Sequence, residues 1–227
     1  MRQSLRAMIV ALGIPVAASL AAAPAAAQVG GIPVYNNGVP RGIGLYGDVG
    51  LPNDEAGGGT AYAFTGRAGF GLFGVTAMLS TYNPDGPAGS DVSVGATANY
   101  RIFGGPLVPL AVTLQAGAGY AKPERGVLPN DEVTQWRFPV GVGFALTIPN
   151  PALAIQPWLA PRIDIVRTSA DGGDAQTDTE FGLSGGIELN LLNGLGVHAA
   201  YDAIFADGGT PGVFGVGAHY NFRVPGL

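Results

Sequence analysis

One stretch of alternating residues, between positions 136 and 148, constrains the fold of this chain more than any other. Large apolar residues stand at every second position: Trp136, Phe138, Val140, Val142, Phe144, Leu146 and Ile148. The residues between them are small or polar: Arg137, Pro139, Gly141, Gly143, Ala145 and Thr147. A period of two indicates a β-strand whose two faces differ in character. A strand of about 9–11 residues crosses a bilayer at roughly 45° of tilt, so this stretch is long enough to do so.

The N-terminal residues have the composition of a secretory signal. Arg2 and Arg6 precede an apolar run over 7–20, and three alanines then stand directly before Gln28. Signal peptides that are cleaved on export have this order of basic, apolar and small residues. We therefore expect 1–27 to be a signal peptide. An N-terminal membrane anchor is the weaker alternative, because the apolar run is too short to span a bilayer as a helix.

The composition favours a membrane protein built from strands. Hydrophobic residues make up 47% of the chain and charged residues only 12%, about half the charge of an ordinary soluble domain. No later run approaches the roughly 18 apolar residues of a membrane helix, whereas a closed barrel satisfies its backbone groups internally. Without cysteine the chain has no disulfide framework and no thiolate chemistry. Signal removal leaves nine basic residues against sixteen acids, a charge that makes nucleic acid a poor partner.

Ten alternating runs follow one another along the chain. They cover 42–50, 59–70, 73–82, 91–102, 108–121, 133–148, 153–167, 179–191, 195–206 and 212–223. Their connections alternate between short turns and longer acidic loops, and an even strand count puts both termini of the chain on one side of the membrane. The sequence therefore predicts a closed antiparallel transmembrane β-barrel over 42–227. Ten strands are expected, with eight as the alternative. Residues 28–41 show no period, so we expect an irregular segment in the periplasm.

The polar face of the runs distinguishes a membrane barrel from a soluble one. Soluble barrels also alternate, with the apolar face inward and a charged face in water. Here the polar face is rich in glycine, alanine, threonine and serine, with an occasional arginine such as Arg101. That composition suits a crowded interior better than a solvated surface.

The hairpin from Gly69 to Val75 and the last run, 212–223, carry a resemblance to a known family. Over 42–223 the chain resembles the small outer-membrane β-barrel proteins of Gram-negative bacteria. The resemblance implies a protein of the outer membrane that is inserted by the barrel-assembly machinery. It also implies contact with outer-membrane lipid and lipopolysaccharide, and a monomeric state.

Three prolines fall inside the predicted strands: Pro139, Pro157 and Pro161. With a turn over 149–152 that sets Ile148 opposite Leu153, Pro139 lies opposite Arg162 and Pro161 opposite Val140. Proline cannot donate to a strand ladder, so we expect a bulge or a weakened seam in this hairpin.

Eight charged side chains are predicted to point into the barrel. The cations are Arg67, Arg101, Arg137 and Arg162, and the anions are Asp48, Asp164, Glu188 and Asp202. The same register sets Arg137 directly opposite Asp164. Buried charges require partners, so a network of ion pairs that fills the lumen is the favoured interpretation. A charged pore lining is the alternative. The inward glycines favour that alternative because they leave space: Gly117, Gly119, Gly141, Gly143, Gly182, Gly186, Gly215 and Gly217.

Both histidines of the chain are also predicted to point inward. A hairpin turn at 192–194 sets Glu188 opposite His198, and pairing of Asp202 with Gly215 would bring His219 beside His198. Carboxylate and imidazole are zinc-ligand types, so these three residues could form a metal or catalytic site. Two imidazoles hydrogen-bonded into the polar network are the favoured interpretation.

The sequence thus indicates an outer-membrane barrel with a structural or surface role or a narrow passive channel. We expect no enzymatic activity, no cofactor and no bound metal. The alternative is an outer-membrane hydrolase or metal-dependent enzyme that uses Glu188, His198 and His219.

Overall fold

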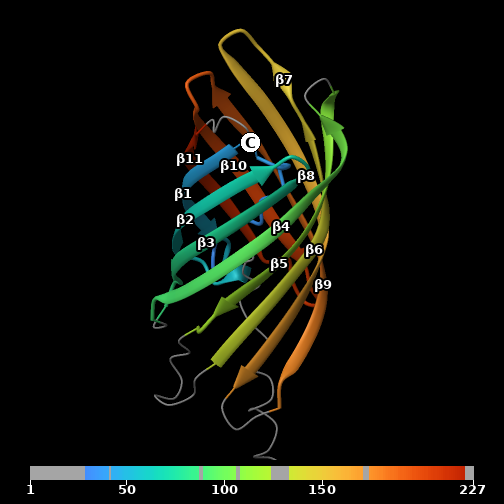
Figure 1. Cartoon of the computed structure of the whole chain (residues 1–227). Helices are drawn as coiled ribbons and strands as arrows, with labels where there is room; N and C mark the ends of the chain where they lie inside the picture. Colours follow the sequence, from blue (N-terminus) through green and yellow to red (C-terminus); the bar gives the residue numbers. More distant parts are fainter. Residues whose placement is uncertain are drawn as a thin grey trace, which may run out of the picture.

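The chain forms a closed antiparallel β-barrel (Figure 1). This computed structural model describes residues 29–40, 42–86, 89–105, 108–123, 133–170 and 174–222. The predicted signal peptide over 1–27, and residues 223–227 of the predicted barrel domain, lie outside the described residues. Within the described ranges, no helix is both long and apolar enough to cross a membrane.

The strands match the alternating runs closely. They are β1 (Gly42–Pro52), β2 (Thr60–Phe70), β3 (Phe73–Asn83), β4 (Asp91–Gly105), β5 (Val108–Ala121), β6 (Val133–Leu146), β7 (Ile148–Pro149), β8 (Leu153–Ala170), β9 (Gln176–Leu191), β10 (Leu195–Phe205) and β11 (Gly212–Phe222). A short 3-10 helix, η1 (Asp54–Ala56), follows β1. Because β7 continues β6 after Thr147 and both pair with β8, the wall has ten strands. The predicted strand count is confirmed.

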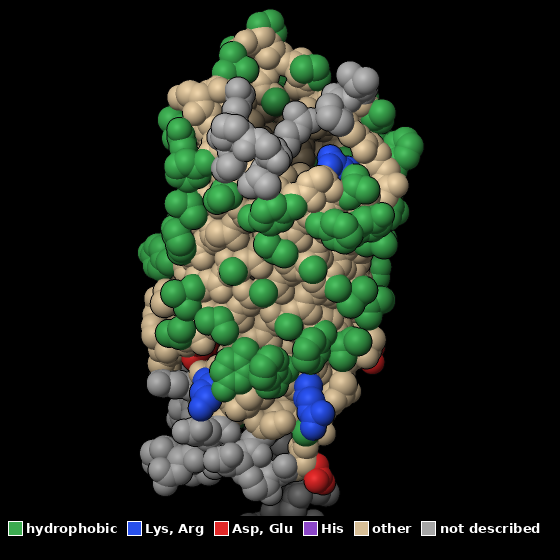
Figure 2. Space-filling model, viewed as in Figure 1, with side chains coloured by type: hydrophobic (Ala, Val, Ile, Leu, Met, Phe, Trp, Pro, Cys, Tyr) green, Lys and Arg blue, Asp and Glu red, His purple; other side chains and the backbone are tan. Residues whose placement is uncertain are grey.

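The two faces of the wall separate apolar from polar side chains. On β2 and β3 the outward Phe64 and Leu79 are exposed, whereas the inward Thr65 and Ser80 are buried. Figure 2 shows hydrophobic side chains spread over the visible wall, with charged side chains toward its two ends. An outer wall of this kind is suited to hydrocarbon, as in transmembrane barrels.

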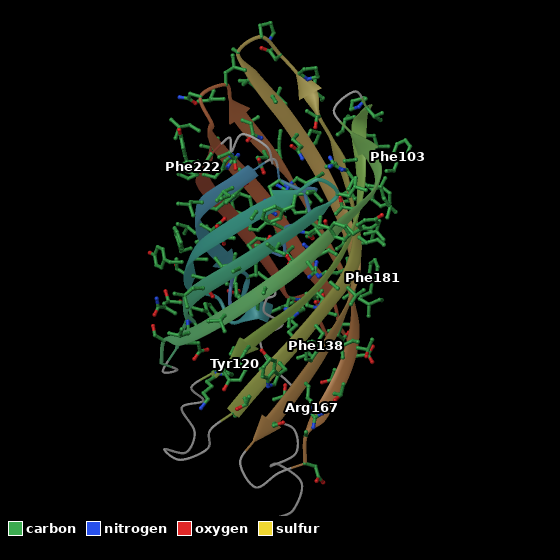
Figure 3. The ribbon with its side chains drawn as sticks, viewed as in Figure 1. Phe103, Tyr120, Phe138, Arg167, Phe181 and Phe222 are labelled. Atoms are coloured by element: carbon green, nitrogen blue, oxygen red, sulfur yellow. The ribbon has the colours of Figure 1, made fainter. Side chains whose placement is uncertain are left out.

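Aromatic side chains gather near both ends of the outer wall. We call the end with the short connections the turn end and the other the loop end. Phe73 packs on Tyr100 near the turn end, and Tyr120 packs on Trp136 near the loop end, each with ring centroids 4.9 Å apart. Figure 3 shows Phe103 toward the turn end and Tyr120 toward the loop end. Aromatic girdles of this kind mark the two membrane interfaces of transmembrane barrels.

Residues 29–40, which we call the plug segment, lie inside the barrel. Val29 and Ile32 pack against Ala61, Met78 and Tyr82 near the loop end and are almost completely buried.

At the opposite end of the plug segment, Pro40 lies against Gly69 and Gly74, beside the turn that joins β2 to β3. The plug segment therefore runs the length of the lumen, and the expectation that it lies in the periplasm is wrong. Its apolar residues gain burial inside the barrel, while Pro33 and Pro40 lack the N–H that a strand ladder requires.

Inward glycines of the wall make room for the plug segment. A Cβ added to Gly215 would lie 2.7 Å from Pro33, and one added to Gly50, Gly69 or Gly143 would lie too close to a carbonyl oxygen of the plug segment. A real Cβ does not approach a backbone atom so closely. The plug segment therefore fills the space at these four glycines, whereas Gly182 and Gly217 make room for the side chains of Arg162 and His198.

Valine in place of Gly143 is expected to destabilise the barrel, because its Cβ would collide with the carbonyl oxygen of Asn36. Overpacking of this kind costs about 1–3 kcal/mol. The matched control is Gly66→Val, since Gly66 faces outward with nothing within 4 Å of an added Cβ. That change should stay within about 0.5 kcal/mol. Urea unfolding followed by tryptophan fluorescence measures both. Equal losses of unfolding free energy in the two variants would contradict the placement of the plug segment.

The β6–β8 hairpin is offset by two residues from its predicted register. Pro139 lies opposite Asp164, not Arg162, and Arg137 lies opposite Val166, not Asp164. The reason is the turn, which begins one residue later than expected. Pro149 still pairs with Ala154, and the loop closes with a 3.0 Å bond from the Asn150 amide to Leu153.

The predicted weakened seam is present as two separate gaps. The β6–β8 register passes from Gly141–Arg162 to Phe144–Leu159, which leaves out Pro161. The β5–β6 register passes from Ala116–Val140 to Gly119–Arg137, which leaves out Pro139. The missing proline N–H accounts for a gap at each position.

Candidate functional site

Four charged residues form a continuous chain of ion pairs inside the wall of β6, β8 and β10. Arg137 Nε lies 2.9 Å from Asp164 Oδ1, and Arg162 Nε lies 2.7 Å from Asp164 Oδ2. Arg162 Nη2 continues the chain to Asp202 Oδ1 at 2.7 Å. All four side chains are buried. With two cations and two anions the chain is neutral, as buried charges require.

The ion-pair chain is joined to the plug segment. Asp202 Oδ2 accepts a 2.8 Å hydrogen bond from the backbone N–H of Val34. Asp202 therefore faces a guanidinium on one side and a main-chain donor on the other, and its carboxylate fixes the height of the plug segment in the barrel.

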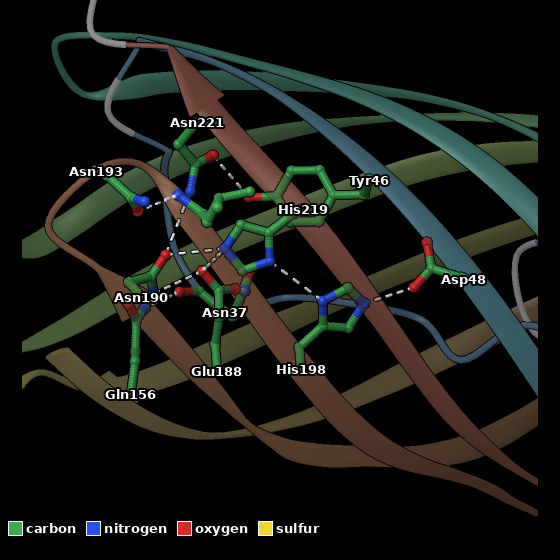
Figure 4. Close-up of polar contacts among 11 residues, drawn as sticks. Asn37, Tyr46, Asp48, Gln156, Glu188, Asn190, Asn193, His198, His219 and Asn221 are labelled. Carbon is green, nitrogen blue, oxygen red and sulfur yellow. Dashed lines mark hydrogen bonds and ion pairs between the residues drawn. The ribbon is translucent and has the colours of Figure 1, made fainter. Parts of the chain in front are cut away.

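A second cluster contains both histidines (Figure 4). His198 Nε2 lies 2.6 Å from Asp48 Oδ1, and His198 Nδ1 lies 3.3 Å from His219 Nδ1. His219 Nε2 faces Asn190 Oδ1 at 2.9 Å and Glu188 Oε1 at 3.5 Å. The strands β1, β9, β10 and β11 thus contribute to a row that runs from one carboxylate through two imidazoles to another carboxylate.

The hydrogen bonds of this row fix the orientation of Asn190. Asn190 Nδ2 donates to Glu188 Oε1 at 2.8 Å, so Asn190 Oδ1 faces His219 Nε2. The buried guanidinium of Arg67 lines the same cavity as the carboxylates of Asp48 and Glu188.

Aromatic rings and the plug segment enclose the histidine cluster. Tyr46 stacks on His219 with ring centroids 4.7 Å apart, and the Arg67 guanidinium lies 4.9 Å from the centroid of Tyr46. From the plug segment, Tyr35 meets His198 edge-on at 5.3 Å and Asn37 donates to Glu188. The free space beside these groups is a cavity of about 10 Å³, room for roughly one water molecule.

The structure places seven of the eight predicted lumen charges in or beside these two clusters. Arg101 is the exception, because it lies at the turn end and donates to the carbonyl of Gly71. The strand β4 places Arg101 on the inward face, but beyond the level of the network. Its guanidinium therefore binds a turn rather than a lumen carboxylate.

The two histidines meet although the predicted register of their hairpin is wrong by two residues. Asp202 lies opposite Val213, not Gly215, because the bond from the Ile204 amide to Pro211 makes the β10–β11 turn tighter than expected. His198 consequently lies opposite Gly217, whose missing side chain leaves room for the imidazole. The predicted pairing of Glu188 with His198 is present.

The cluster does not have the geometry of a metal site. The ring nitrogens of His198 and His219 are directed at each other, at Asp48 and at Asn190, so they do not converge on a common point. Across the described ranges, no group of three or more histidine, cysteine or acidic side chains is arranged to hold a metal ion. The polar atoms of both imidazoles instead face neighbouring side chains of the wall.

Several lumen residues were missed by sequence reasoning. Asn190 and Asn221 share the inward face with Glu188 and His219, so the same alternation could have found them. Tyr35 and Asn37 could not be found in that way, because the plug segment has no period.

Several solved structures of outer-membrane proteins are similar to the chain at low sequence identity. No family model and no curated protein matches the chain. The N-terminal β-barrel domain of Pseudomonas aeruginosa OprF is 12% identical over 81% of this chain and 98% of its own, with a TM-score of 0.40. Ail of Yersinia pestis is 14% identical over 80% and 99%, with a TM-score of 0.37. The Escherichia coli outer membrane protease OmpT is 8% identical over 80% and 94%, with a TM-score of 0.41. At these values the likeness concerns the barrel fold and extends to no activity.

Proposed function

We propose that this protein is a monomeric outer-membrane β-barrel with a structural or surface role, closed by its own N-terminal segment. The apolar outer wall and its two aromatic girdles support a place in a bilayer. The order of basic, apolar and small residues over 1–27 supports export by a cleaved signal. Its partners are outer-membrane lipid and lipopolysaccharide, with the barrel-assembly machinery acting during insertion.

The occupied lumen is the observation that carries this proposal. The plug segment runs from one end of the barrel to the other, and Ile32 and Val34 within it have almost no exposed surface. Ion pairs and hydrogen bonds link the side chains around it. A solute therefore has no continuous path through the closed barrel.

Solute flux into liposomes tests the closed barrel. The protein is refolded, its native state is verified by heat-dependent gel mobility, and it is inserted into liposomes. In arabinose solution these liposomes are expected to swell no faster than protein-free liposomes. A chain that begins at Gly42 provides the positive control, since it lacks the plug segment. Swelling by the full mature chain as fast as in that control would overturn the proposal. Recovery of the protein in the inner-membrane fraction of cells would overturn its location.

We also propose that the protein is not an enzyme. Glu188, His198 and His219 are bonded to one another and covered by Tyr35 and Asn37, so the cavity beside them admits no substrate.

Replacement of both histidines by glutamine is expected to preserve the assembled barrel and to lower its stability by about 1–3 kcal/mol. The reason is that His198→Gln and His219→Gln leave buried carboxylates of Asp48 and Glu188 with poorer donors. Urea unfolding and heat-dependent mobility measure the effect. The matched control is Thr179→Gln, on an exposed position of β9. A double variant as stable as the wild type would contradict the structural role of the pair.

A further inference from the structure

Side chains of the wall hold the main chain of the plug segment. Ser93 Oγ accepts from Gly30 N at 2.7 Å, and Ser80 Oγ donates to Gly30 O at 3.3 Å. Gln115 and Gln156 donate to the carbonyls of Tyr35 and Asn37 at 2.8 and 2.6 Å. These are separate side-chain contacts, unlike the continuous backbone ladders that join the strands to each other. Each contact can be exchanged for a hydrogen bond to water.

The wall beneath the plug segment is apolar where Ala61, Met78 and Tyr82 contact it near the loop end, and polar where it holds the main chain of the plug segment. The groups that contact the main chain of the plug segment are hydroxyls, amides and the carboxylate of Asp202. Loss of the plug segment would therefore expose polar groups that can form hydrogen bonds to water.

The closed state also leaves inward hydroxyl groups without protein partners. Among the described side chains, six buried hydroxyls form no hydrogen bond to another protein group: Tyr35 of the plug segment, and Thr65, Thr76, Thr97, Thr113 and Ser184 of the wall. An unsatisfied buried polar group carries a desolvation cost that water entry removes. Hydration of these groups offsets part of the free energy of burial that is lost when the plug segment leaves the lumen.

The connection to β1 determines the direction in which the plug segment can leave. Pro40 lies beside the β2–β3 turn, and β1 begins at Gly42 at the same end of the barrel. The plug segment is thus tethered at the turn end, while Gly30 at its far end touches Ser93 near the loop end. Withdrawal toward the turn end clears the lumen with no change in the strands.

We propose that the plug segment is a reversible plug, and that its withdrawal toward the turn end opens a water-filled pore for small inorganic ions. This function goes beyond the structural role of the closed barrel. The ion-pair chain of Arg137, Asp164, Arg162 and Asp202 stays on the wall when the plug segment leaves. Because that chain is neutral, the open pore discriminates weakly between potassium and chloride.

A disulfide at the loop end tests the proposal. A Cβ added to Gly30 would lie 3.5 Å from Ser93 Oγ, so Gly30→Cys with Ser93→Cys is within reach of a bond. The chain has no other cysteine. Single-channel recording in potassium chloride is made on the same double variant before and after reduction. Brief openings are expected in the wild type and the reduced variant, with at least a tenfold lower open fraction in the oxidised variant.

The single variants Gly30→Cys and Ser93→Cys, together with reductant added to the wild type, are the controls. Where the double variant does not refold, Gly30→Cys with Tyr82→Cys replaces it, because a Cβ at Gly30 would lie 3.3 Å from that of Tyr82. No openings in the wild type or the reduced variant would overturn the reversible plug and leave the closed barrel intact. Equal openings before and after reduction would overturn it too. Rapid arabinose swelling by the wild type would instead overturn the closed barrel itself.

Discussion

A chain that begins at Gly42 is expected to conduct ions continuously, whereas the full mature chain is closed for most of the recording. An eight-stranded barrel is nearly filled by its own side chains, but ten strands enclose more space and many inward positions here are glycine. The plug segment fills that space, as the fit of Gly143 and Gly215 around it shows. Its removal should raise the open fraction at least tenfold in planar bilayers.

A peptide supplied in solution is the matched control for this deletion. A peptide with the sequence of 29–40 is expected to block the shortened barrel, and a peptide of the same composition in scrambled order is not. The native order matters because Gly30, Val34 and Asn37 meet specific wall groups. If the shortened chain does not refold, a triple variant with serine in place of Val29, Ile32 and Val34 is used instead. These changes are expected to displace the plug segment from the lumen. A folded but silent shortened barrel would mean that side chains alone close the lumen.

Asparagine in place of Asp164 is expected to be the most destabilising single change in the wall. The carboxylate of Asp164 is fully buried, accepts a hydrogen bond from Arg137 and forms an ion pair with Arg162. Its loss leaves two buried guanidinium groups with one remaining anion, Asp202. Breaking a buried ion pair from one side costs about 3–5 kcal/mol. The urea midpoint of the refolded barrel should fall accordingly.

The control for Asp164→Asn makes the same chemical change on the surface. Asp174→Asn alters an exposed carboxylate next to β9 and should change stability by less than about 0.5 kcal/mol. Replacement of Arg137 by methionine in the Asp164→Asn background removes one unpaired cation, so it should restore part of the loss. A loss below about 1 kcal/mol for Asp164→Asn would contradict the role given to the ion-pair chain.

The strands could be predicted from the sequence because a lipid-facing wall enforces strict alternation. Trp136, Phe138 and Val140 face outward, and Arg137 between them faces inward, which is all that strand identification requires. The same alternation predicted that both histidines and eight charged residues face inward, and seven of the eight lie in or beside the two clusters. Arg137 and Asp164 meet although their register was wrong by two residues, because a long arginine side chain reaches a diagonal neighbour.

The exact register and the plug segment could not be predicted, for different reasons. Register depends on where a turn begins, and Pro149 and Asn150 both suit a turn. The structure begins the loop at Asn150. The plug segment is held by side-chain contacts to its main chain, which leave no periodic trace in its own residues. Inward glycines such as Gly143 were ambiguous, because empty space and contact with main chain require the same residue.

The central claim is that the N-terminal segment occupies the lumen, and one measurement tests it directly. In methyl-labelled protein refolded in detergent micelles, nuclear Overhauser effects are recorded between Ile32 and Ala61, which share a buried cluster near the loop end. Cross-peaks between the methyl groups of these two residues are the expected result. Their absence, together with broadening of the Ile32 methyl signals by a water-soluble paramagnetic agent, would contradict the account.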